Sequence, residues 1–316
     1  MSKRVVVFLD SVHPVLEEKL NKAGFECRMH FKTSFDELQD ELKQAYGLVI
    51  RSRFTIDAQF LNSCPHLNFI ARSGSGLENI DTALCSQKQI RLYNSPEGNR
   101  NAVAEHALGM LLSLMNNLNK ADREVRNGIW KREANRGEEL DGKTVGIIGY
   151  GNNGAAFAKK LRGFDVKVLA YDKYKSGFGD HTVQESTLAS IQQQADIISF
   201  HIPQNKETKH FFNADFLQQC QKPIYLLNLS RGKVVDTEAV VTGLKSGKLK
   251  GAGLDVLEYE QKSFEAFFAA ELPAAFSYLV SAPNVILTPH VGGWTTESYY
   301  KLSSYLADKI LADELT

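Results

Sequence analysis

The 316-residue chain has little cysteine, and its four cysteines stand far apart. They include no C-x-x-C pair, and four cysteines in a chain of this length do not form a disulfide scaffold. We expect Cys27, Cys64, Cys85 and Cys220 to be mostly buried thiols of a cytoplasmic protein.

The chain also lacks any stretch that approaches the roughly 20 apolar residues needed to span a bilayer. Residues 5–9 follow a basic pair, as in a signal peptide, but this apolar run is too short and Asp10 interrupts it. A buried opening strand explains it better. The 37 basic and 37 acidic side chains cancel and are spread along the chain. We therefore expect a small molecule as partner, with no nucleic acid and no membrane.

The length of the chain favours two domains, each with its own hydrophobic core. In the first hundred residues, apolar runs alternate with amphipathic stretches such as 15–23, which predicts a parallel sheet. The stretch 103–115 is apolar on most faces and predicts a buried helix, followed by a loop-rich polar link over 119–141. The apolar runs that predict strands are 5–9, 48–50 and 69–71.

A second series of short apolar strands begins at residues 144–148. Helical spacers separate these strands, which is typical of a doubly wound domain with helices on both faces of its sheet. The last helical stretch, 298–312, follows this sheet and could return to the first lobe. The later strands are predicted at 166–171, 196–201, 224–228, 253–256 and 285–288.

A glycine-rich turn, G-Y-G-N-N-G at 149–154, directly follows the strand 144–148 and precedes a helix-like segment. This spacing alone is a weak signal, but the strand-turn-helix setting is the one that dinucleotide binding requires. Gly149 permits the tight turn, Gly151 lets the backbone approach a pyrophosphate, and Gly154 lets the helix pack against the strand. The helix N-terminus, at Asn152 and Asn153, offers N–H groups and its positive dipole end to phosphates.

Asp172 stands at the end of the next predicted strand, 18 residues beyond Gly154. A carboxylate there can accept hydrogen bonds from the adenosine ribose hydroxyls and would repel a 2′-phosphate, which favours NAD over NADP. Lys173 and Lys175 are near enough in sequence to soften this preference.

Three downstream segments, 228–232, 254–260 and 288–293, place ionisable residues just after predicted strands, where ligands bind in such sheets. At this point the sequence resembles the D-isomer-specific 2-hydroxyacid dehydrogenases, and the resemblance covers nearly the whole chain. The motifs that carry it, in order, are R-S-G-S-G at 72–76 with N-I-D at 79–81, V-A-E-H at 103–106, the glycine turn, S-F-H-I-P at 199–203, N-L-S-R-G at 228–232 and T-P-H-V-G-G at 288–293.

The resemblance implies that Arg231, Glu260 and His290 are the catalytic residues, and their chemistry suits these roles. His290 can act as general base toward a substrate hydroxyl, and as acid when a 2-keto acid is reduced, because imidazole titrates near neutral pH. Glu260 would orient His290 and stabilise its protonated form. Arg231 can hold the substrate carboxylate and polarise its carbonyl with a fixed fork of donors.

The segment after the acidic residue departs from the family pattern. Family members commonly continue this motif with proline, whereas Glu260 is followed by Gln-Lys and then by an enlarged segment, 263–282, rich in Phe and Ala. Glu258 therefore competes with Glu260 as the partner of His290. The position five residues after Asp255 matches the family spacing and favours Glu260.

The resemblance implies NAD as the cofactor and adds further contacts with it. Asp255 would hold the nicotinamide carboxamide, because a carboxylate can accept from an amide NH2. His201 and Pro203 would lie by the adenine ribose, although His201 could equally cap the strand end. Thr208 would lie near the pyrophosphate or its loop. The remaining contacts implied are Val103, Leu229, Arg231, His290 and Gly292.

The first lobe should supply the contacts with substrate. The loop 73–76 can wind its backbone N–H groups around a carboxylate as an anion nest. The segment 51–53 resembles the one that contacts substrate in phosphoglycerate dehydrogenases, and two arginines suit a phosphate or a second acid group. The residues concerned are Arg51, Ser52, Arg53, Ser73, Gly74, Ser75 and Gly76.

We predict an α/β protein with two Rossmann-like lobes. A smaller flavodoxin-like substrate lobe, 1–99 completed by 289–316, would carry an inserted NAD-binding doubly wound parallel sheet, 100–288, with the active site in the cleft. The family resemblance implies a homodimer joined through the segment near 100–140. We expect neither a metal site nor a separate regulatory domain.

The predicted reaction is reversible hydride transfer between NAD and a D-2-hydroxy acid, with D-3-phosphoglycerate or hydroxypyruvate the leading substrates. A glyoxylate, D-lactate or other 2-keto acid reductase is the alternative enzyme, and the Arg51 and Arg53 pair is the feature that separates the two. An alternative of another class is an NAD-sensing binding protein like the C-terminal-binding-protein corepressors. Basic partner-binding extensions of that class are not evident in the sequence.

Overall fold

The computed structural model describes residues 4–260 and 273–314, and the chain divides into two compact units. Unit 1 contains residues 1–99 and 294–316, and unit 2 contains residues 100–293. The return to the first unit comes after residue 293 and not after 288, so that His290 and Gly292 belong to unit 2. Residues 263–272 of the enlarged segment noted in the sequence lie outside the described residues.

Unit 1 is built on a parallel five-stranded sheet in the order β2-β1-β3-β4-β5, the flavodoxin-like order. Its strands are β1 (Val5–Phe8), β2 (Glu26–Met29), β3 (Ala45–Ile50), β4 (Phe69–Arg72) and β5 (Arg91–Asn94). Its helices are α1 (Val15–Lys22), α2 (Gln39–Gln44), α3 (Ala58–Asn62), α4 (Thr82–Gln87) and α12 (Thr296–Glu314).

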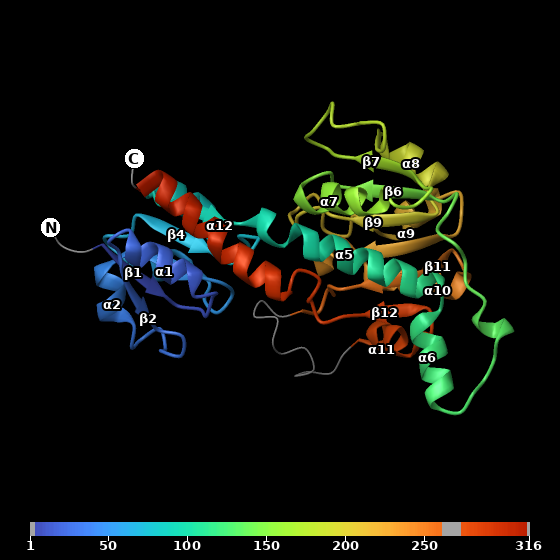
Figure 1. The fold of residues 1–316 in the computed structure, drawn as a ribbon, viewed down its shortest axis with the longest axis horizontal. Coiled ribbons are helices and arrows are strands. Elements are labelled where there is room, and N and C mark those ends of the chain that lie inside the picture. The colour runs from blue at the N-terminus through green and yellow to red at the C-terminus, as the bar shows by residue number, and fades with distance from the viewer. Residues whose placement is uncertain (1–3, 261–272, 315–316) are drawn as a thin grey trace. The chain divides into compact units, whose positions relative to one another are not determined.

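Alternate residues of β1 enter two cores on the opposite faces of this sheet. Val7 joins the core that contains side chains from α2, α3 and α4. Phe8 joins the other core, with side chains from α1 and α12. Figure 1 shows α12 in red beside the blue α1, two helices in contact from opposite ends of the chain. The C-terminal helix thus completes the core begun by the N-terminal strands.

Unit 2 is built on a parallel seven-stranded sheet in the order β12-β11-β10-β9-β6-β7-β8. Its first six strands follow the doubly wound dinucleotide-binding order, which reverses between β6 and β9. The strands are β6 (Thr144–Ile148), β7 (Lys167–Tyr171), β8 (Gln184–Glu185), β9 (Ile197–Phe200), β10 (Ile224–Asn228), β11 (Leu249–Leu254) and β12 (Val285–Leu287). The helices are α5 (Pro96–Met115, whose first residues belong to unit 1), α6 (Leu118–Arg126), α7 (Asn152–Leu161), α8 (Leu188–Gln194), α9 (Ala214–Gln219), α10 (Thr237–Ser246) and α11 (Ala274–Ser281).

Helices cover both faces of the seven-stranded sheet. Ile147 of β6 joins a core with side chains from α5 and α7, whereas Ile148 joins a core with side chains from α8, α9, α10 and α11. Each fully buried side chain of this size contributes about 1.5–3 kcal/mol to the free energy of unfolding. The predicted α/β class with two parallel sheets is therefore confirmed.

The prediction of a loop-rich link over 119–141 was wrong in part, because Leu118–Arg126 forms helix α6. This helix has no buried residue, although Leu118, Ala121 and Val125 recur at the spacing of one helix face, a signal in the sequence that the prediction of a loop overlooked. The edge strands β2 and β5 were also missed, since charged residues interrupt them. The four cysteines are free thiols. None of the described helices is long and apolar enough to cross a membrane.

Candidate functional site

The glycine turn joins β6 to α7, as the sequence predicted. Gly149 has a φ of +95°, which favours glycine, and a Cβ at position 154 would lie 2.0 Å from the Gly149 carbonyl oxygen. A Cβ at Gly151 would meet no other group of the residues that the structure describes within 4 Å, apart from its own neighbours in the chain. The turn is therefore closed on its helix side and open at Gly151, where a pyrophosphate could approach the backbone.

The polar groups at this turn suit a bound dinucleotide. The N-cap residue of α7 is Gly151, which has no side chain to cap the helix, so that the first N–H groups of α7 are left for a phosphate. Two buried polar atoms, Asn153 Oδ1 and His201 Nδ1, have no hydrogen-bond partner within the described part of the chain. A Cβ at Gly149 would lie 2.7 Å from the His201 carbonyl oxygen, so both atoms belong to the surroundings of the turn. Polar atoms left without a partner are expected beside a polar ligand.

Asp172 follows β7 and lies at the glycine turn. Its Oδ2 accepts from the Tyr150 N–H at 2.8 Å, and its Oδ1 accepts from the N–H groups of Tyr174 and Lys175 at 2.9 and 3.1 Å. A carboxylate has about four acceptor sites, so this side chain retains capacity to accept from a ribose hydroxyl.

His201 and Pro203 begin the loop after β9. The His201 Nε2 lies 2.8 Å from the Ser199 hydroxyl, and its ring lies beside Phe157 with centroids 5.6 Å apart. Burial lowers the pKa of His201 to about 4, because the charged imidazolium is poorly solvated there. The ring is thus neutral at physiological pH and is anchored within unit 2.

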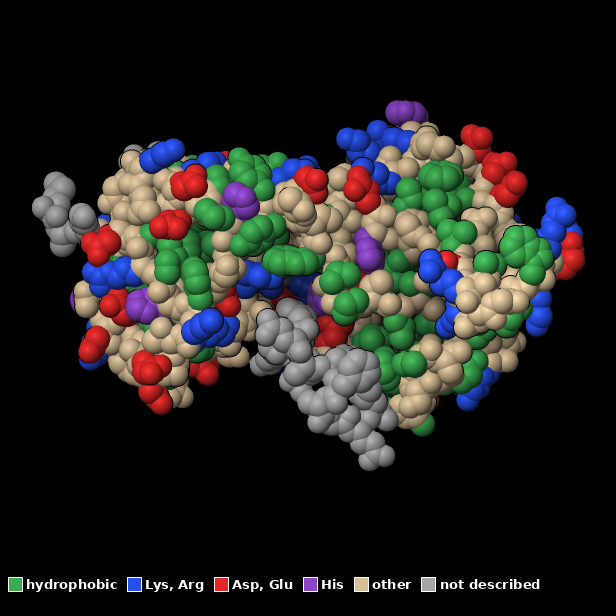
Figure 2. Space-filling model, turned by 60° about the horizontal axis from the view of Figure 1, so that its bottom comes forward, with side chains coloured by type: hydrophobic (Ala, Val, Ile, Leu, Met, Phe, Trp, Pro, Cys, Tyr) green, Lys and Arg blue, Asp and Glu red, His purple; other side chains and the backbone are tan. Residues whose placement is uncertain are grey.

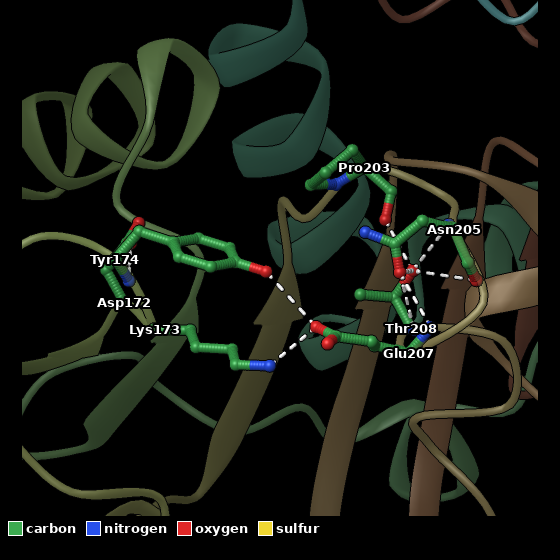
Figure 3. Close-up of polar contacts among 7 residues, drawn as sticks. All are labelled: Asp172, Lys173, Tyr174, Pro203, Asn205, Glu207 and Thr208. Carbon is green, nitrogen blue, oxygen red and sulfur yellow. Dashed lines mark hydrogen bonds and ion pairs between the residues drawn. The ribbon is translucent and has the colours of Figure 1, made fainter.

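Thr208 braces this loop internally, as Figure 3 shows. Its hydroxyl donates to the Pro203 carbonyl at 2.6 Å and accepts from the Asn205 N–H at 2.8 Å. The Asn205 side chain in turn accepts from the N–H groups of Glu207 and Thr208. The structure therefore gives the Thr208 side chain a bracing role in a loop beyond β9.

Arg231 lies on a tight turn after β10 that the Asn228 side chain organises. Asn228 Oδ1 accepts from the Ser230 N–H and hydroxyl at 3.1 and 2.8 Å, and its Nδ2 donates to the Arg231 carbonyl at 3.0 Å. A Cβ at Gly232 would lie 1.9 Å from the Leu257 carbonyl oxygen. Glycine at this position lets the Arg231 turn pack against the segment that carries Glu260.

His290 and Glu260 form a hydrogen-bonded pair, with Nδ1 and Oε2 2.7 Å apart. Because an ionised carboxylate only accepts, Nδ1 carries a hydrogen, and Nε2 is the ring nitrogen that can gain or lose a proton. Glu260 is fixed in turn, since its Oε1 accepts from the Leu257 N–H. His290 has a φ of +55°, a conformation uncommon outside glycine, and its N–H donates to the carbonyls of Asp255 and Thr288.

Glu258, the competing carboxylate, has different partners. Its Oε1 lies 2.6 Å from His210 Nε2, and its Oε2 accepts from the N–H and the hydroxyl of Thr237 at 2.7 and 2.6 Å. Thr237 is the first residue of α10, where a carboxylate also interacts favourably with the helix dipole. The structure thus separates the two glutamates and places Glu260 with His290.

Asp255 is buried, and its carboxylate holds the segment 288–292. Oδ1 accepts from the Thr288 hydroxyl at 2.6 Å and the Val291 N–H at 2.9 Å, and Oδ2 accepts from the Gly292 N–H at 2.8 Å. His106 Nε2 lies 3.0 Å from Thr288 Oγ1 and 3.6 Å from Asp255 Oδ1. No role was predicted for His106 or Thr288 from the sequence, although both lie in motifs that carried the resemblance.

Two predicted cofactor contacts, Val103 and Leu229, are members of one hydrophobic core of unit 2, each 5% exposed. Gly292 lies against Asp255, because a Cβ there would be 2.8 Å from the carboxylate oxygen Oδ2. Among the residues 4–260 and 273–314, no group of three or more His, Cys, Asp or Glu could hold a metal ion.

In unit 1, the two arginines predicted to bind substrate are engaged differently. Arg53 donates through Nη1 to the carbonyls of Leu9 and His30 at 2.9 and 2.7 Å, and through Nη2 to the carbonyl of Thr33. The Arg51 guanidinium lies over the Trp294 ring, 4.3 Å from its centroid. Arg53 thus holds backbone of unit 1 together, and Arg51 is the better candidate of the two for an anionic group of the substrate.

The loop 73–76 of unit 1 is fixed by backbone and side-chain bonds. The Ser73 N–H donates to the Ile50 carbonyl and the Gly74 carbonyl accepts from the Ser95 N–H. The Ser75 hydroxyl donates to Asn99 Oδ1 at 2.8 Å. Gly74 has a φ of +157°, and a Cβ there would clash with the Arg72 guanidinium. The segment Arg51 and Ser52 lies at the end of the neighbouring strand β3.

Comparison with known proteins gives a consistent result. Residues 108–292 match the model of the D-isomer specific 2-hydroxyacid dehydrogenase, NAD binding domain. The chain is 34% identical to a hydroxypyruvate reductase of Thermotoga maritima over 88% of each chain. It is 32% identical to the D-3-phosphoglycerate dehydrogenase of Haemophilus influenzae, over 98% of this chain and 74% of the relative.

Other relatives are longer, and the chain covers only 55% of the D-3-phosphoglycerate dehydrogenase of Archaeoglobus fulgidus. Among solved structures, the chain is similar to the D-lactate dehydrogenase of Aquifex aeolicus in complex with NAD and lactic acid. The TM-score is 0.85 at 26% identity, over 99% of this chain and 96% of the other.

Proposed function

Because the chain belongs to the D-isomer-specific 2-hydroxyacid dehydrogenase family, we propose that it oxidises or reduces its acid with Arg231, Glu260 and His290 as catalytic residues. The observation that carries this proposal is the 2.7 Å bond between His290 Nδ1 and Glu260 Oε2. It supports a role for Nε2, the ring nitrogen that Glu260 does not contact, in exchanging a proton with the substrate oxygen.

The proton steps follow from this pair. In the oxidation direction, His290 Nε2 accepts the proton of the 2-hydroxyl group, and the Glu260 carboxylate stabilises the positive charge that the ring then carries. In the reduction direction, the charged ring donates that proton to the 2-oxo oxygen. Bound NAD supplies the chemistry of hydride acceptance and donation.

Arg231 would anchor the acid and polarise its 2-oxo group, because a guanidinium offers several donors in a fixed plane. Its turn is rigid through the Asn228 side chain and packs closely on the segment before Glu260 at Gly232. This packing fixes the position of Arg231 relative to Glu260 and His290, and efficient catalysis requires such fixed positions.

The residues that would hold NAD surround the glycine turn and the ends of β7, β9 and β11. Gly151 and the first turn of α7 would face the pyrophosphate, and Asp172 would accept from the adenosine ribose. Asp255 would accept from the nicotinamide carboxamide with the capacity left on Oδ2. The other proposed contacts are Val103, Gly149, Asn152, Asn153, Gly154, His201, Pro203, Thr208, Leu229, Arg231, His290 and Gly292.

For the substrate we propose D-3-phosphoglycerate, the acid in the names of several relatives. Arg51 supplies the cationic group in unit 1, and its stacking on Trp294 limits its motion. Ser52 and the loop 73–76 would add polar contacts from the same unit.

A second candidate is the reduction of hydroxypyruvate or glyoxylate, the compounds in the names of other relatives. It is favoured by the carbonyl partners of Arg53, because that guanidinium has few donors left for a phosphate.

The test follows NADH absorbance with 3-phosphohydroxypyruvate, hydroxypyruvate and glyoxylate, for the parent and for His290→Ala and Arg231→Ala. We expect turnover by the parent, a loss of at least about 100-fold in kcat for His290→Ala, in the range of lost acid–base catalysis, and a comparable loss in kcat/KM for Arg231→Ala, because the acid is no longer anchored. Unchanged turnover in both variants would refute the assignment. Arg51→Met should raise KM selectively for the phosphorylated acid, while Arg53→Met should lower thermal stability without that selectivity.

We further propose a homodimer joined through α6 and the segment after it. Leu118, Val125, Ile129 and Trp130 are 53%, 52%, 39% and 84% exposed, a concentration of apolar surface that a partner copy would cover. Figure 2 shows charges of both signs interspersed on the face that it draws.

We also propose that the protein is located in the cytoplasm, because its four cysteines are free thiols and a reducing compartment keeps thiols reduced.

A further inference from the structure

The loops that follow β7 and β9 are joined by one carboxylate, that of Glu207 (Figure 3). Lys173 Nζ lies 2.5 Å from Glu207 Oε2, and the Tyr174 hydroxyl donates to the same oxygen at 3.1 Å. Lys173 and Tyr174 directly follow Asp172, which bonds to the glycine turn. Glu207 therefore contacts the two residues that follow Asp172, the side chain beside which the adenosine ribose would lie.

The backbone fixes the place of Glu207 independently of its ion pair. Asn205 Oδ1 accepts from the N–H groups of Glu207 and Thr208 at 2.8 and 3.0 Å. The Thr208 hydroxyl closes the same turn by donating to the Pro203 carbonyl. Figure 3 shows Glu207 extending from this braced turn toward the side chains of Lys173 and Tyr174.

The pairing changes what Lys173 can do. A lysine directly after the ribose-binding acid is a natural partner for a 2′-phosphate, because an ammonium group is a compact cation with three donors. The bond to Glu207 raises the pKa of Lys173, and Lys173 lowers the pKa of Glu207, so both groups are charged at neutral pH. The positive charge is thus balanced before any cofactor binds.

We propose that Glu207 is a specificity-determining residue that disfavours NADP by engaging Lys173, the residue directly after Asp172. The inference rests on the proposed function in that the glycine turn binds a nicotinamide dinucleotide and Asp172 accepts from its adenosine ribose. The bond to Glu207 would offset the attraction of Lys173 for a 2′-phosphate beside Asp172.

The test measures dissociation constants of NADH and NADPH by fluorescence titration, at low and at physiological salt. We expect Glu207→Gln to tighten NADPH binding about tenfold at low salt and less at high salt, with NADH within about twofold, since exposed charges are screened. Glu133→Gln is the matched control. Its side chain is 78% exposed and is paired with Arg136, and we expect it to shift neither constant.

The double variant Glu207→Gln/Lys173→Ala identifies the group that is released. We expect NADPH affinity to return to the parent value, because the freed lysine is then absent. An unchanged NADPH-to-NADH ratio in Glu207→Gln, or a gain that survives the loss of Lys173, overturns the inference. A parent that binds neither cofactor overturns the proposed function and this inference with it, whereas NADH binding by the parent leaves the two separable.

Discussion

The Thr288 hydroxyl donates to Asp255 Oδ1 at 2.6 Å, and its oxygen remains able to accept from His106 Nε2, 3.0 Å away. The imidazole must therefore carry its hydrogen on Nε2 if both bonds are made at once. The same Asp255 carboxylate also accepts hydrogen bonds from the N–H groups of Val291 and Gly292. A residue of helix α5 is thus linked to the segment that carries His290.

Thr288→Val should lower the free energy of unfolding by about 1–3 kcal/mol, because Asp255 and His106 each lose a partner in a largely buried place. Thr288→Ser keeps the hydroxyl and should lose less. Urea unfolding followed by circular dichroism measures the difference. Equal stability of the Val and Ser variants would show that the methyl group, and not the hydrogen bonds, accounts for the effect.

Replacing the two neighbouring glutamates should give opposite phenotypes. Glu260→Gln should reduce kcat by about 100-fold with a small change in stability, because the charged His290 ring loses its carboxylate. Glu258→Gln should lower the melting temperature and leave kcat within a few fold, because it weakens the N-terminus of α10 and the contact with His210. Steady-state kinetics and thermal denaturation of both variants decide this, and a reversed pattern would contradict the pairing.

Gly154→Ala should weaken NADH binding by at least tenfold and lower stability. Its Cβ would lie 2.0 Å from the Gly149 carbonyl oxygen, so that the turn must open. Gly151→Ala is the informative comparison, because its Cβ has open space around it within residues 4–260 and 273–314. We expect that variant to fold with nearly parental stability and to lose NADH affinity alone, as measured by fluorescence titration. NADH binding unchanged by Gly151→Ala would place the pyrophosphate elsewhere.

His201 should make stability fall as the pH is lowered. Its pKa is about 4 in the folded protein against 6.5 for the free side chain, so the unfolded chain takes up the proton first. The loss begins below about pH 6.5, is complete near pH 4 and amounts to about 3 kcal/mol. Denaturant unfolding of the parent and of His201→Gln between pH 7 and pH 4 tests this. The difference in stability between them should change over that window, and parallel curves would show that His201 is readily protonated in the folded state.

Local sequence was enough to predict the strand-turn-helix segment with its glycines and the place of Asp172 at the end of the next strand. These features depend on interactions within about 30 residues, where turn geometry and apolar patterning act directly. The order of residues also separated the two sheets, because apolar strands and helical spacers alternate in both. Helix α6 has a helical pattern of its own, with Leu118, Ala121 and Val125 on one face, but its mostly polar composition favoured a loop, and only the structure shows that Leu118 and Val125 are exposed and not part of a core.

The partners of the individual side chains, by contrast, depend on the tertiary structure. Glu258 and Glu260 are two residues apart, yet one bonds to His210 and the other to His290, on segments that the chain order does not bring together. Arg53 likewise directs its donors to carbonyls 20 to 44 residues away, which no motif announces. Such pairings follow from the packing of non-local segments. A hydrogen bond requires a donor–acceptor distance of about 3 Å, and the spacing of residues along the chain does not specify that distance.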